Sequence, residues 1–265
     1  MIRDITIGQY YPGNTVVHKL DPRVKIIITF LFIMALFFID KFLPYLFILG
    51  FILMAILISK IPIKYILKGL KPLLPIILIT FVLNLFMTKG QVIFEIGPLD
   101  VTIEGLNKAL FMALRLIFLI VGTSLLTLTT SPISLTDGIE KLLNPFRRIG
   151  VPAHELAMMM TIALRFIPTL LEEADKIMKA QMARGADFES GNILNRAKSL
   201  VPLLVPLFVS AFRRADELAM AMEARCYRGG ENRTRMKQLV LKERDFIALG
   251  IMIALFVIIV LYRYL

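Results

Sequence analysis

FIALGIMIALFVIIVL, residues 246–261, contains no charged or hydrogen-bonding side chain. With its flanking residues, this run is long enough for a helix that crosses the hydrocarbon layer of a bilayer, which takes about 20 residues. Four more apolar runs precede it, at residues 24–39, 42–58, 72–87 and about 106–130. The sequence therefore predicts an all-α polytopic membrane protein with about five transmembrane helices.

The composition favours a membrane protein over a soluble one. Hydrophobic residues make up 57% of the 265 residues and the mean hydropathy is +0.75, whereas soluble domains contain about 45–50% apolar residues. The formal charge of +11 could indicate nucleic-acid binding, but no basic stripe with interleaved aromatic residues occurs. Excess Lys and Arg is also typical of cytoplasmic loops of membrane proteins, so no nucleic-acid partner is expected.

Basic residues predict the orientation of the chain in the bilayer. They lie before or at the start of the first run and between the second and third runs, at Arg3, Lys19, Arg23, Lys25, Lys60, Lys64, Lys68 and Lys71. Acidic residues gather after the third run, at Glu95, Asp100 and Glu104. Because cytoplasmic loops carry the excess of Lys and Arg, the amino terminus and residues 131–245 are predicted on the cytoplasmic side of the cell membrane. The predicted parts are a membrane domain (1–130), a cytoplasmic domain (131–245) and a final transmembrane helix (246–265).

The predicted cytoplasmic segment contains two long amphipathic helices. Apolar residues recur at helical spacing over residues 153–184 and again over 197–225, and Pro168 should kink the first helix. A shorter helix is predicted over residues 135–147, with Ser134 as its N-cap. The long helices are too polar to span the membrane and too apolar to lie free in water. Their methionine-rich faces therefore need a cover, which could be the membrane interface, each other or another protein.

Two stretches of this segment match each other at an offset of 41 residues. Residues 174–185 read ADKIMKAQMARG and residues 215–226 read ADELAMAMEARC, so that Ala, Asp, Ala, Ala and Arg coincide at the predicted helix ends. An Arg in a last turn can merely complement the helix dipole, and small Ala residues can merely allow close packing. Neither role explains the shared order and spacing. We interpret the copies as docking ends for two like partners, in which Arg184 and Arg225 each bind a carboxylate.

The sequence contains no energy source of its own. No Walker A sequence occurs, and the apolar runs hold almost no carboxylates that could relay protons or sodium ions. With one cysteine and two histidines, neither an internal disulfide nor a histidine-rich metal site is expected. A membrane protein with two docking helices and no motor fits a coupling subunit that is not an enzyme and carries neither cofactor nor metal.

The order of several motifs resembles the transmembrane (T) component of energy-coupling factor (ECF) transporters. The similar motifs are YPGN at residues 11–14, HKLDPR at 18–23, RFIP at 165–168, ARG at 183–185 and ARC at 224–226. The family has Ala-Arg-Gly at both helix ends. Cys226 departs from this pattern, so Gly229 is expected to supply the turn at the second end.

This resemblance implies a set of partners in the lipid bilayer and at its surface. Two ABC-type ATPases, which bind ATP and Mg²⁺, would dock on the two helix ends. The docking residues would be Ala183, Arg184, Gly185, Ala224, Arg225 and Cys226. A small membrane-embedded capture protein, the S component, would lie against an apolar face with Met159, Met160, Ala163 and Ile167. The complex would import a vitamin or a metal ion, and this chain would transmit the ATP-driven motion.

Two rival functions make different demands on the sequence. A substrate-binding permease subunit of an ordinary ABC importer presents one coupling helix per chain and works as a pair, which fits two docking signatures on one chain poorly. A membrane-embedded enzyme needs a catalytic set in its spans, and no His/Glu, Ser/Lys or paired Asp set occurs there. The coupling subunit is the preferred hypothesis, and the permease subunit is the alternative.

Overall fold

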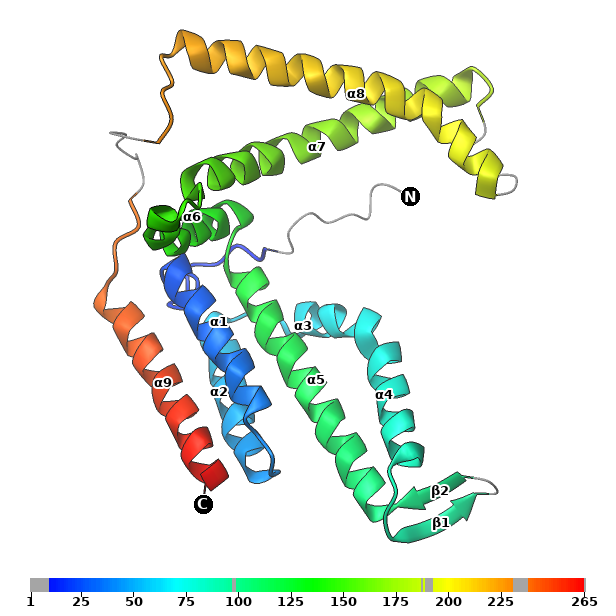
Figure 1. Cartoon of the computed structure of the whole chain (residues 1–265), viewed down its shortest axis with the longest axis vertical. Helices are drawn as coiled ribbons and strands as arrows, with labels where there is room; N and C mark the ends of the chain where they lie inside the picture. Colours follow the sequence, from blue (N-terminus) through cyan, green and yellow to red (C-terminus); the bar gives the residue numbers. More distant parts are fainter. Residues whose placement is uncertain (1–9, 97–98, 187, 189–192, 231–237, 265) are drawn as a thin grey trace. The chain divides into compact units, whose positions relative to one another are not determined.

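The computed structural model describes residues 10–96, 99–186, 188, 193–230 and 238–264 of the chain (Figure 1). The chain divides into two compact units. The membrane unit combines residues 8–138 with the carboxyl-terminal residues 238–265, and the arm unit contains residues 139–237. The boundary between the units falls within helix α6 (Pro132–Leu143).

The elements of the membrane unit follow the apolar runs of the sequence. They are α1 (Pro22–Phe37), α2 (Leu43–Ser59), α3 (Ile63–Leu70), the 3₁₀ turn η2 (Lys71–Leu73), α4 (Leu74–Met87), β1 (Val92–Ile96), β2 (Leu99–Thr102), α5 (Ile103–Thr129) and α9 (Glu243–Tyr264). Proline stands in the first turn of α1, α2 and α4, where its missing N–H removes no helical hydrogen bond. Helix α2 ends where Lys60 adopts the left-handed conformation, with φ of 54°.

Four helical stretches of the described chain are long and apolar enough to cross a membrane. They are residues 63–87, α5, α7 (Ala153–Ala183) and α9, and α2 is apolar but shorter. These helices confirm the prediction of an all-α polytopic membrane protein. Two details differ from expectation. The predicted first span corresponds to α1, which has only 16 residues, and α7 meets the length and composition of a span although the sequence predicts it in the cytoplasm.

A short antiparallel hairpin, which the sequence did not predict, joins α4 to α5. In this hairpin β1 pairs with β2, so that Glu95 lies opposite Asp100. Thr102 connects the hairpin to α5, because its hydroxyl accepts the Gly105 N–H at 3.0 Å and donates to the Thr88 carbonyl at 2.8 Å. Two of the three acidic residues that follow the third apolar run, Glu95 and Asp100, therefore lie in a small two-stranded sheet.

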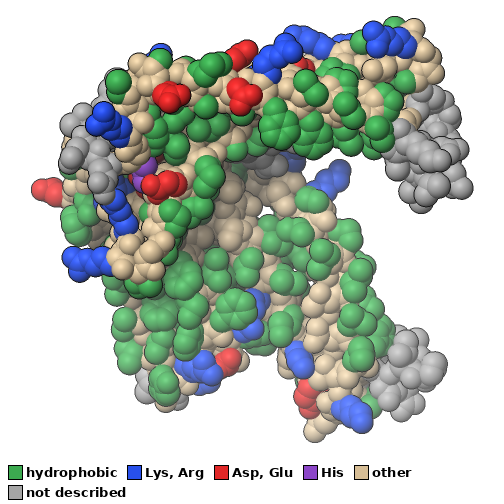
Figure 2. Space-filling view, turned by 45° about the horizontal axis from the view of Figure 1, so that its top comes forward, with side chains coloured by type: hydrophobic (Ala, Val, Ile, Leu, Met, Phe, Trp, Pro, Cys, Tyr) green, Lys and Arg blue, Asp and Glu red, His purple; other side chains and the backbone are tan. Residues whose placement is uncertain are grey.

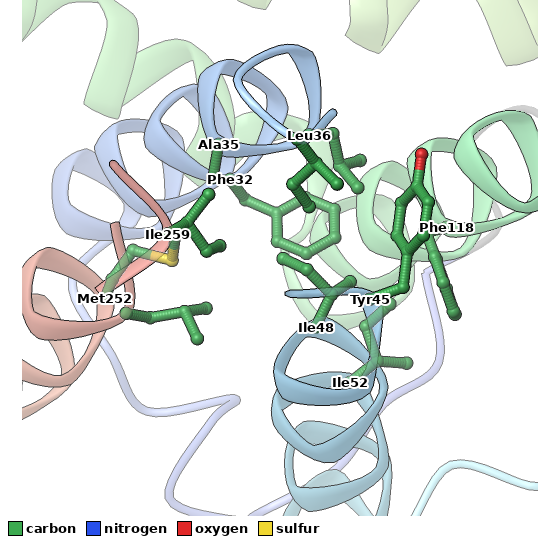
Figure 3. Close-up of a cluster of buried hydrophobic side chains, with 11 residues drawn as sticks. Phe32, Ala35, Leu36, Tyr45, Ile48, Ile52, Phe118, Met252 and Ile259 are labelled. Atoms are coloured by element: carbon green, nitrogen blue, oxygen red, sulfur yellow. The ribbon is translucent and has the colours of Figure 1, made fainter. Parts of the chain in front are cut away.

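The core of the membrane unit lies where α1, α2, α5 and α9 meet (Figure 3). Its labelled side chains are Phe32, Ala35, Leu36, Tyr45, Ile48, Ile52, Phe118, Met252 and Ile259. Gly122 of α5 permits a close approach here, because an added Cβ would lie 2.2 Å from the Phe32 ring. Lipid tails are as apolar as these side chains, so close packing rather than transfer from water holds the helices together.

A polar cluster ties the start of α1 to α5 and α9. The Asp21 side chain caps α1 by accepting the Arg23 N–H at 2.9 Å, and the Asp21 N–H donates to the buried Asp245 carboxylate at 2.7 Å. Lys25 Nζ donates to the Thr129 carbonyl at 2.9 Å. Burial alone would raise the pKa of the Asp21 carboxyl, but the hydrogen bonds and charge of Arg23 outweigh it and lower that pKa. The HKLDPR motif at residues 18–23 is thus part of a clamp between helices.

The arm unit contains the 3₁₀ turn η3 (Asn144–Ile149), α7 and α8 (Ile193–Ala224). Helix α6 starts earlier than predicted because Ser131 rather than Ser134 caps it, with the Ser131 hydroxyl accepting the Ser134 N–H at 3.2 Å. The predicted continuation of that helix to residue 147 is a 3₁₀ turn, which ends at Gly150 with φ of 93°. Helices α7 and α8 continue through internal prolines and pack against each other.

Candidate functional site

The end of α7 carries the first copy of the repeated sequence. Arg184 is its C-cap, and Gly185 follows with φ of 87°. The Gly185 N–H donates to the Met182 carbonyl and the Ala186 N–H donates to the Gln181 carbonyl, both at 2.9 Å. These two bonds form a Schellman turn, which satisfies the last free carbonyls and ends the helix sharply. The arginine is therefore held at the tip of the helix.

The end of α8 has the same geometry. Its turn is closed by the N–H groups of Cys226 and Tyr227, which donate to carbonyls of the last helical turn at 2.8 and 3.0 Å. The expectation that Gly229 supplies this turn is wrong. Cys226 itself adopts the left-handed conformation, with φ of 56°, at the position that matches Gly185. The Schellman bonds require a positive φ at that position whichever residue occupies it.

Both helix ends are accessible. Every residue of the two docking signatures is exposed: Ala183, Arg184, Gly185, Ala224, Arg225 and Cys226. Figure 1 shows the end of α7 and the end of α8 at opposite ends of the helix pair. The two arginines therefore do not meet in one site but occupy two separate sites of like backbone geometry.

Replacing Cys226 with glycine is expected to stabilise the end of α8. A side-chain-bearing residue in the left-handed conformation costs about 1–2 kcal/mol, which glycine avoids. Amide hydrogen exchange at Tyr227, whose N–H closes the turn, should therefore slow by roughly fivefold or more. Gly185→Ala is the matched change in α7 and should accelerate exchange at Ala186. Unchanged exchange in both variants would contradict the assigned backbone strain.

A histidine links the end of α8 to α6 and the start of α7. His154 Nε2 lies 3.2 Å from the Tyr227 hydroxyl, and His154 Nδ1 lies 3.1 Å from Glu140 Oε1. The backbone at Gly230 lies against the same ring, because an added Cβ there would come within 2.4 Å of it. Tyr227 directly follows the turn at Cys226, so these contacts restrain the helix end that bears the second arginine. The sequence did not predict this role of His154.

The apolar face predicted for the capture protein is only partly accessible. Met159 is 54% exposed and Ala163 is exposed, whereas Met160 and Ile167 are half-buried. These four residues all lie on α7, at the helical spacing that the sequence predicted. Met159 is the largest accessible member of this face, so it is the residue best placed for contact with a partner.

A larger exposed apolar surface lies on α8, within the amphipathic helix that the sequence predicted over residues 197–225. This α8 stripe consists of Val201, Leu204, Val205, Phe208, Val209 and Phe212, whose side chains are 41–69% exposed. Figure 2 shows hydrophobic side chains gathered along the long helices of the arm unit. Positions 201, 205, 208 and 212 follow the spacing of one helix face, so the pattern was present in the sequence. What the sequence could not show was that this face is left uncovered by the chain itself.

Comparison with known proteins covers almost the whole chain. The sequence model of the family described as cobalt transport protein, CbiQ, matches residues 13–236. A protein of Thermosediminibacter oceani named energy-coupling factor transporter transmembrane protein EcfT is 70% identical over 254 residues, which cover 95% of this chain and 96% of that protein. Proteins of the same name from Clostridium kluyveri and Bacillus subtilis are 68% and 52% identical, over 94% and 92% of this chain and 93% of each relative. The similarity includes both the membrane unit and the arm unit.

Proposed function

We propose, from the premise that this chain belongs to the family of energy-coupling factor transporter transmembrane proteins, that it couples two ATPases to a separate capture protein. As a transmembrane component of such a transporter, the chain lies in a membrane and takes part in transport. In the proposed complex, ATP and Mg²⁺ are bound by the two ABC-type ATPases. The capture protein, or S component, binds the imported vitamin or metal ion.

The main support for this proposal is the likeness of the two helix ends. Two copies or homologues of one ATPase offer two like binding grooves, and like grooves need like ligands. Arg184 and Arg225 stand at matched positions of two Schellman turns, and both are exposed. A guanidinium can form two parallel hydrogen bonds to a carboxylate, which fixes the orientation of the docked helix as well as its charge partner. Each helix end is thus proposed to insert its arginine into an acidic groove of one ATPase.

The capture protein is proposed to cover the apolar faces of α7 and α8. These are the face of α7 with Met159, Met160, Ala163 and Ile167, and the α8 stripe. Contiguous apolar surface of this kind marks a protein or membrane interaction site, and methionine adapts to partners of different shape. Charged residues such as Arg165 and Glu172 on α7 are exposed, which favours a position at the membrane surface over a span.

Motion is proposed to pass along the helices themselves. Helices α7 and α8 contain 31 and 32 residues, and a helix of that length extends about 45–48 Å. The docking arginine lies at the tip of each helix and the apolar face lies along its length. When an ATPase displaces the tip of a helix, the apolar face of that helix therefore moves with it. The capture protein that covers this face is shifted directly, with no other element in between.

Purification of the native complex tests this function. Affinity purification of the chain from its own membranes, followed by mass spectrometry, should recover two ATPase subunits and a small membrane protein. Substrate binding should follow the small membrane protein and be absent from the isolated chain. Specific substrate binding by the isolated chain would support a substrate-binding permease subunit instead.

The native cysteine tests the proposed cytoplasmic position of residues 131–245. Cys226 is the single cysteine of the chain and is exposed. A membrane-impermeant maleimide should label it in inside-out vesicles and not in right-side-out vesicles, because the basic loops predict a cytoplasmic position for this segment. In a chain with Cys226→Ala, the added change Tyr264→Cys should give the opposite labelling. Labelling of both positions from one side would contradict the predicted topology.

A further inference from the structure

An apolar cavity lies between the helices of the membrane unit. Its volume is about 160 Å³, and residues of α1, α2, α5 and α9 line it. The lining residues come mostly from the first halves of α1 and α9 and the second halves of α2 and α5. The cavity therefore lies at one end of this bundle, the end that is predicted on the cytoplasmic side. Phe32 and Ile52, which belong to the core in Figure 3, line its inner end.

The cavity suits a hydrocarbon better than it suits water. Its lining contains three polar side chains, Lys25, Thr29 and Thr129. Lys25 Nζ donates to the His18 carbonyl, the Thr129 carbonyl and the Thr130 hydroxyl, at 3.2, 2.9 and 3.1 Å. The two threonine hydroxyls donate to carbonyls of their own helices at 2.8 and 2.7 Å. A buried water needs about two to four polar partners, whereas an apolar cavity of this size stays dry and binds small hydrocarbons.

The cavity is open toward the bilayer. Three of its lining residues are also exposed, since Met54 and Ile58 of α2 and Ile251 of α9 are 47%, 38% and 41% exposed. These apolar side chains lie on membrane helices, so the hydrocarbon of the surrounding lipids is what reaches the opening. An acyl chain can therefore enter between α2 and α9 and lie along α1.

An arginine without a partner lies just beyond the cavity. Arg244 is in the first turn of α9, and positions 244, 248 and 251 share one face of that helix. Ala248 and Ile251 line the cavity. Because helical side chains point toward the start of their helix, Arg244 extends from the cavity toward the predicted cytoplasmic surface. Its Nε atom is buried and has no hydrogen-bond partner in the described part of the chain, which is unfavourable for a donor.

The charges around Arg244 favour an anion. Residues 19–25 and 242–245 contain five basic and three acidic side chains in total. The Asp21 carboxylate already pairs with Arg23, and the Asp245 carboxylate accepts the N–H groups of Asp21 and Lys242. The charges of Arg244 and Lys25 repel each other. An anion beside Arg244 would supply the missing partner and reduce this repulsion.

We propose that this cavity and Arg244 form a binding site for one anionic phospholipid, whose acyl chain occupies the cavity and whose phosphate binds the guanidinium of Arg244. Basic pockets between transmembrane helices on the cytoplasmic side bind anionic lipid headgroups, and a guanidinium forms paired hydrogen bonds to phosphate. The acyl chain adds packing contacts that the four helices lack at the cavity. The site needs neither an ATPase nor a capture protein, so it does not depend on the proposed function.

The chain contains no tryptophan, which permits a direct test by fluorescence quenching. Phe51 lines the cavity, whereas Phe47, one turn away on α2, is 44% exposed and lies outside it. The full chain with Phe51→Trp or Phe47→Trp is reconstituted in phosphatidylcholine vesicles. A small fraction of phosphatidylglycerol with brominated acyl chains should quench the Phe51→Trp chain roughly fivefold more strongly than the same fraction of brominated phosphatidylcholine. The two lipids should quench the Phe47→Trp chain alike.

Further changes in the Phe51→Trp chain separate the two parts of the site. Ala248→Phe fills the cavity and should remove the strong quenching, whereas Ala254→Phe, at an exposed position of the same helix, should not. Arg244→Gln should remove the preference for phosphatidylglycerol. Arg263→Gln, at the other end of α9, should keep that preference.

Each part of the site has a result that would overturn it. Far-ultraviolet circular dichroism checks that every variant keeps its helix content, and Ala55→Phe fills the cavity from α2 if Ala248→Phe does not fold. Unchanged quenching in a chain whose cavity is filled would overturn the acyl-chain site. Equal quenching by the two brominated lipids, with Arg244 intact, would overturn the phosphate site.

Discussion

Reversing the charge of either docking arginine is expected to abolish uptake. In Arg184→Glu or Arg225→Glu, a carboxylate would face the acidic groove of an ATPase. Loss of a close charge pair at an interface costs about 2–5 kcal/mol, so binding of an ATPase at that end should weaken by at least roughly thirtyfold. Because the proposed coupling needs both α7 and α8 to move, one defective end should suffice to stop transport, whereas the effects on ATPase retention should add in the double variant.

Conservative and neighbouring changes distinguish docking from a local role. Arg→Lys keeps the charge but loses the forked hydrogen bonds, so it should restore binding only in part. A role limited to the helix dipole would tolerate lysine fully. Lys179→Glu and Arg228→Glu are matched controls, since both residues are exposed and near the same helix ends but outside the shared signature. Full ATPase retention by the double variant Arg184→Glu with Arg225→Glu would exclude the docking sites.

Charge placed in the α8 stripe is expected to release the capture protein while the ATPases stay bound. Phe208 and Phe212 are 60% and 69% exposed, and a buried phenylalanine contributes about 1.5–3 kcal/mol to an interface. Phe208→Glu with Phe212→Glu also buries two charges against an apolar surface. Co-purification of the capture protein should therefore fall by roughly a hundredfold.

Variants of the α7 face, and of an apolar residue outside both faces, are compared with this variant of the α8 stripe. Met159→Glu should also weaken capture-protein binding, because Met159 is the accessible large residue of that face. Met160→Glu is less suitable, since Met160 is half-buried and the change would also perturb folding. Ile149 is 80% exposed but lies in η3, outside both faces, so Ile149→Glu should have no effect. Loss of the ATPases before the capture protein would show that the faces are assigned wrongly.

The sequence by itself determined the class of the protein and the position of its long helices. Apolar runs such as residues 246–261 and helical spacing such as that of residues 153–184 are local signals, because a helix satisfies its backbone hydrogen bonds within one segment. The matched helix ends were visible for the same reason. Each Schellman turn is closed by residues only a few positions apart, so like sequences give like turns. Even so, the sequence predicted the second turn at Gly229 rather than at Cys226, because a positive φ is usually adopted by glycine and not by cysteine.

The tertiary structure alone decided which distant residues meet and which faces remain open. Asp245 binds the backbone of Asp21 across 224 positions of the chain, and Glu173 of α7 pairs with Arg214 of α8. No periodicity encodes such partners, since the energy of a half-buried or buried charge depends on what the folded chain brings beside it. The same holds for the α8 stripe. Its spacing is written in the sequence, but its exposure is not, because exposure depends on whether a neighbouring helix covers the face.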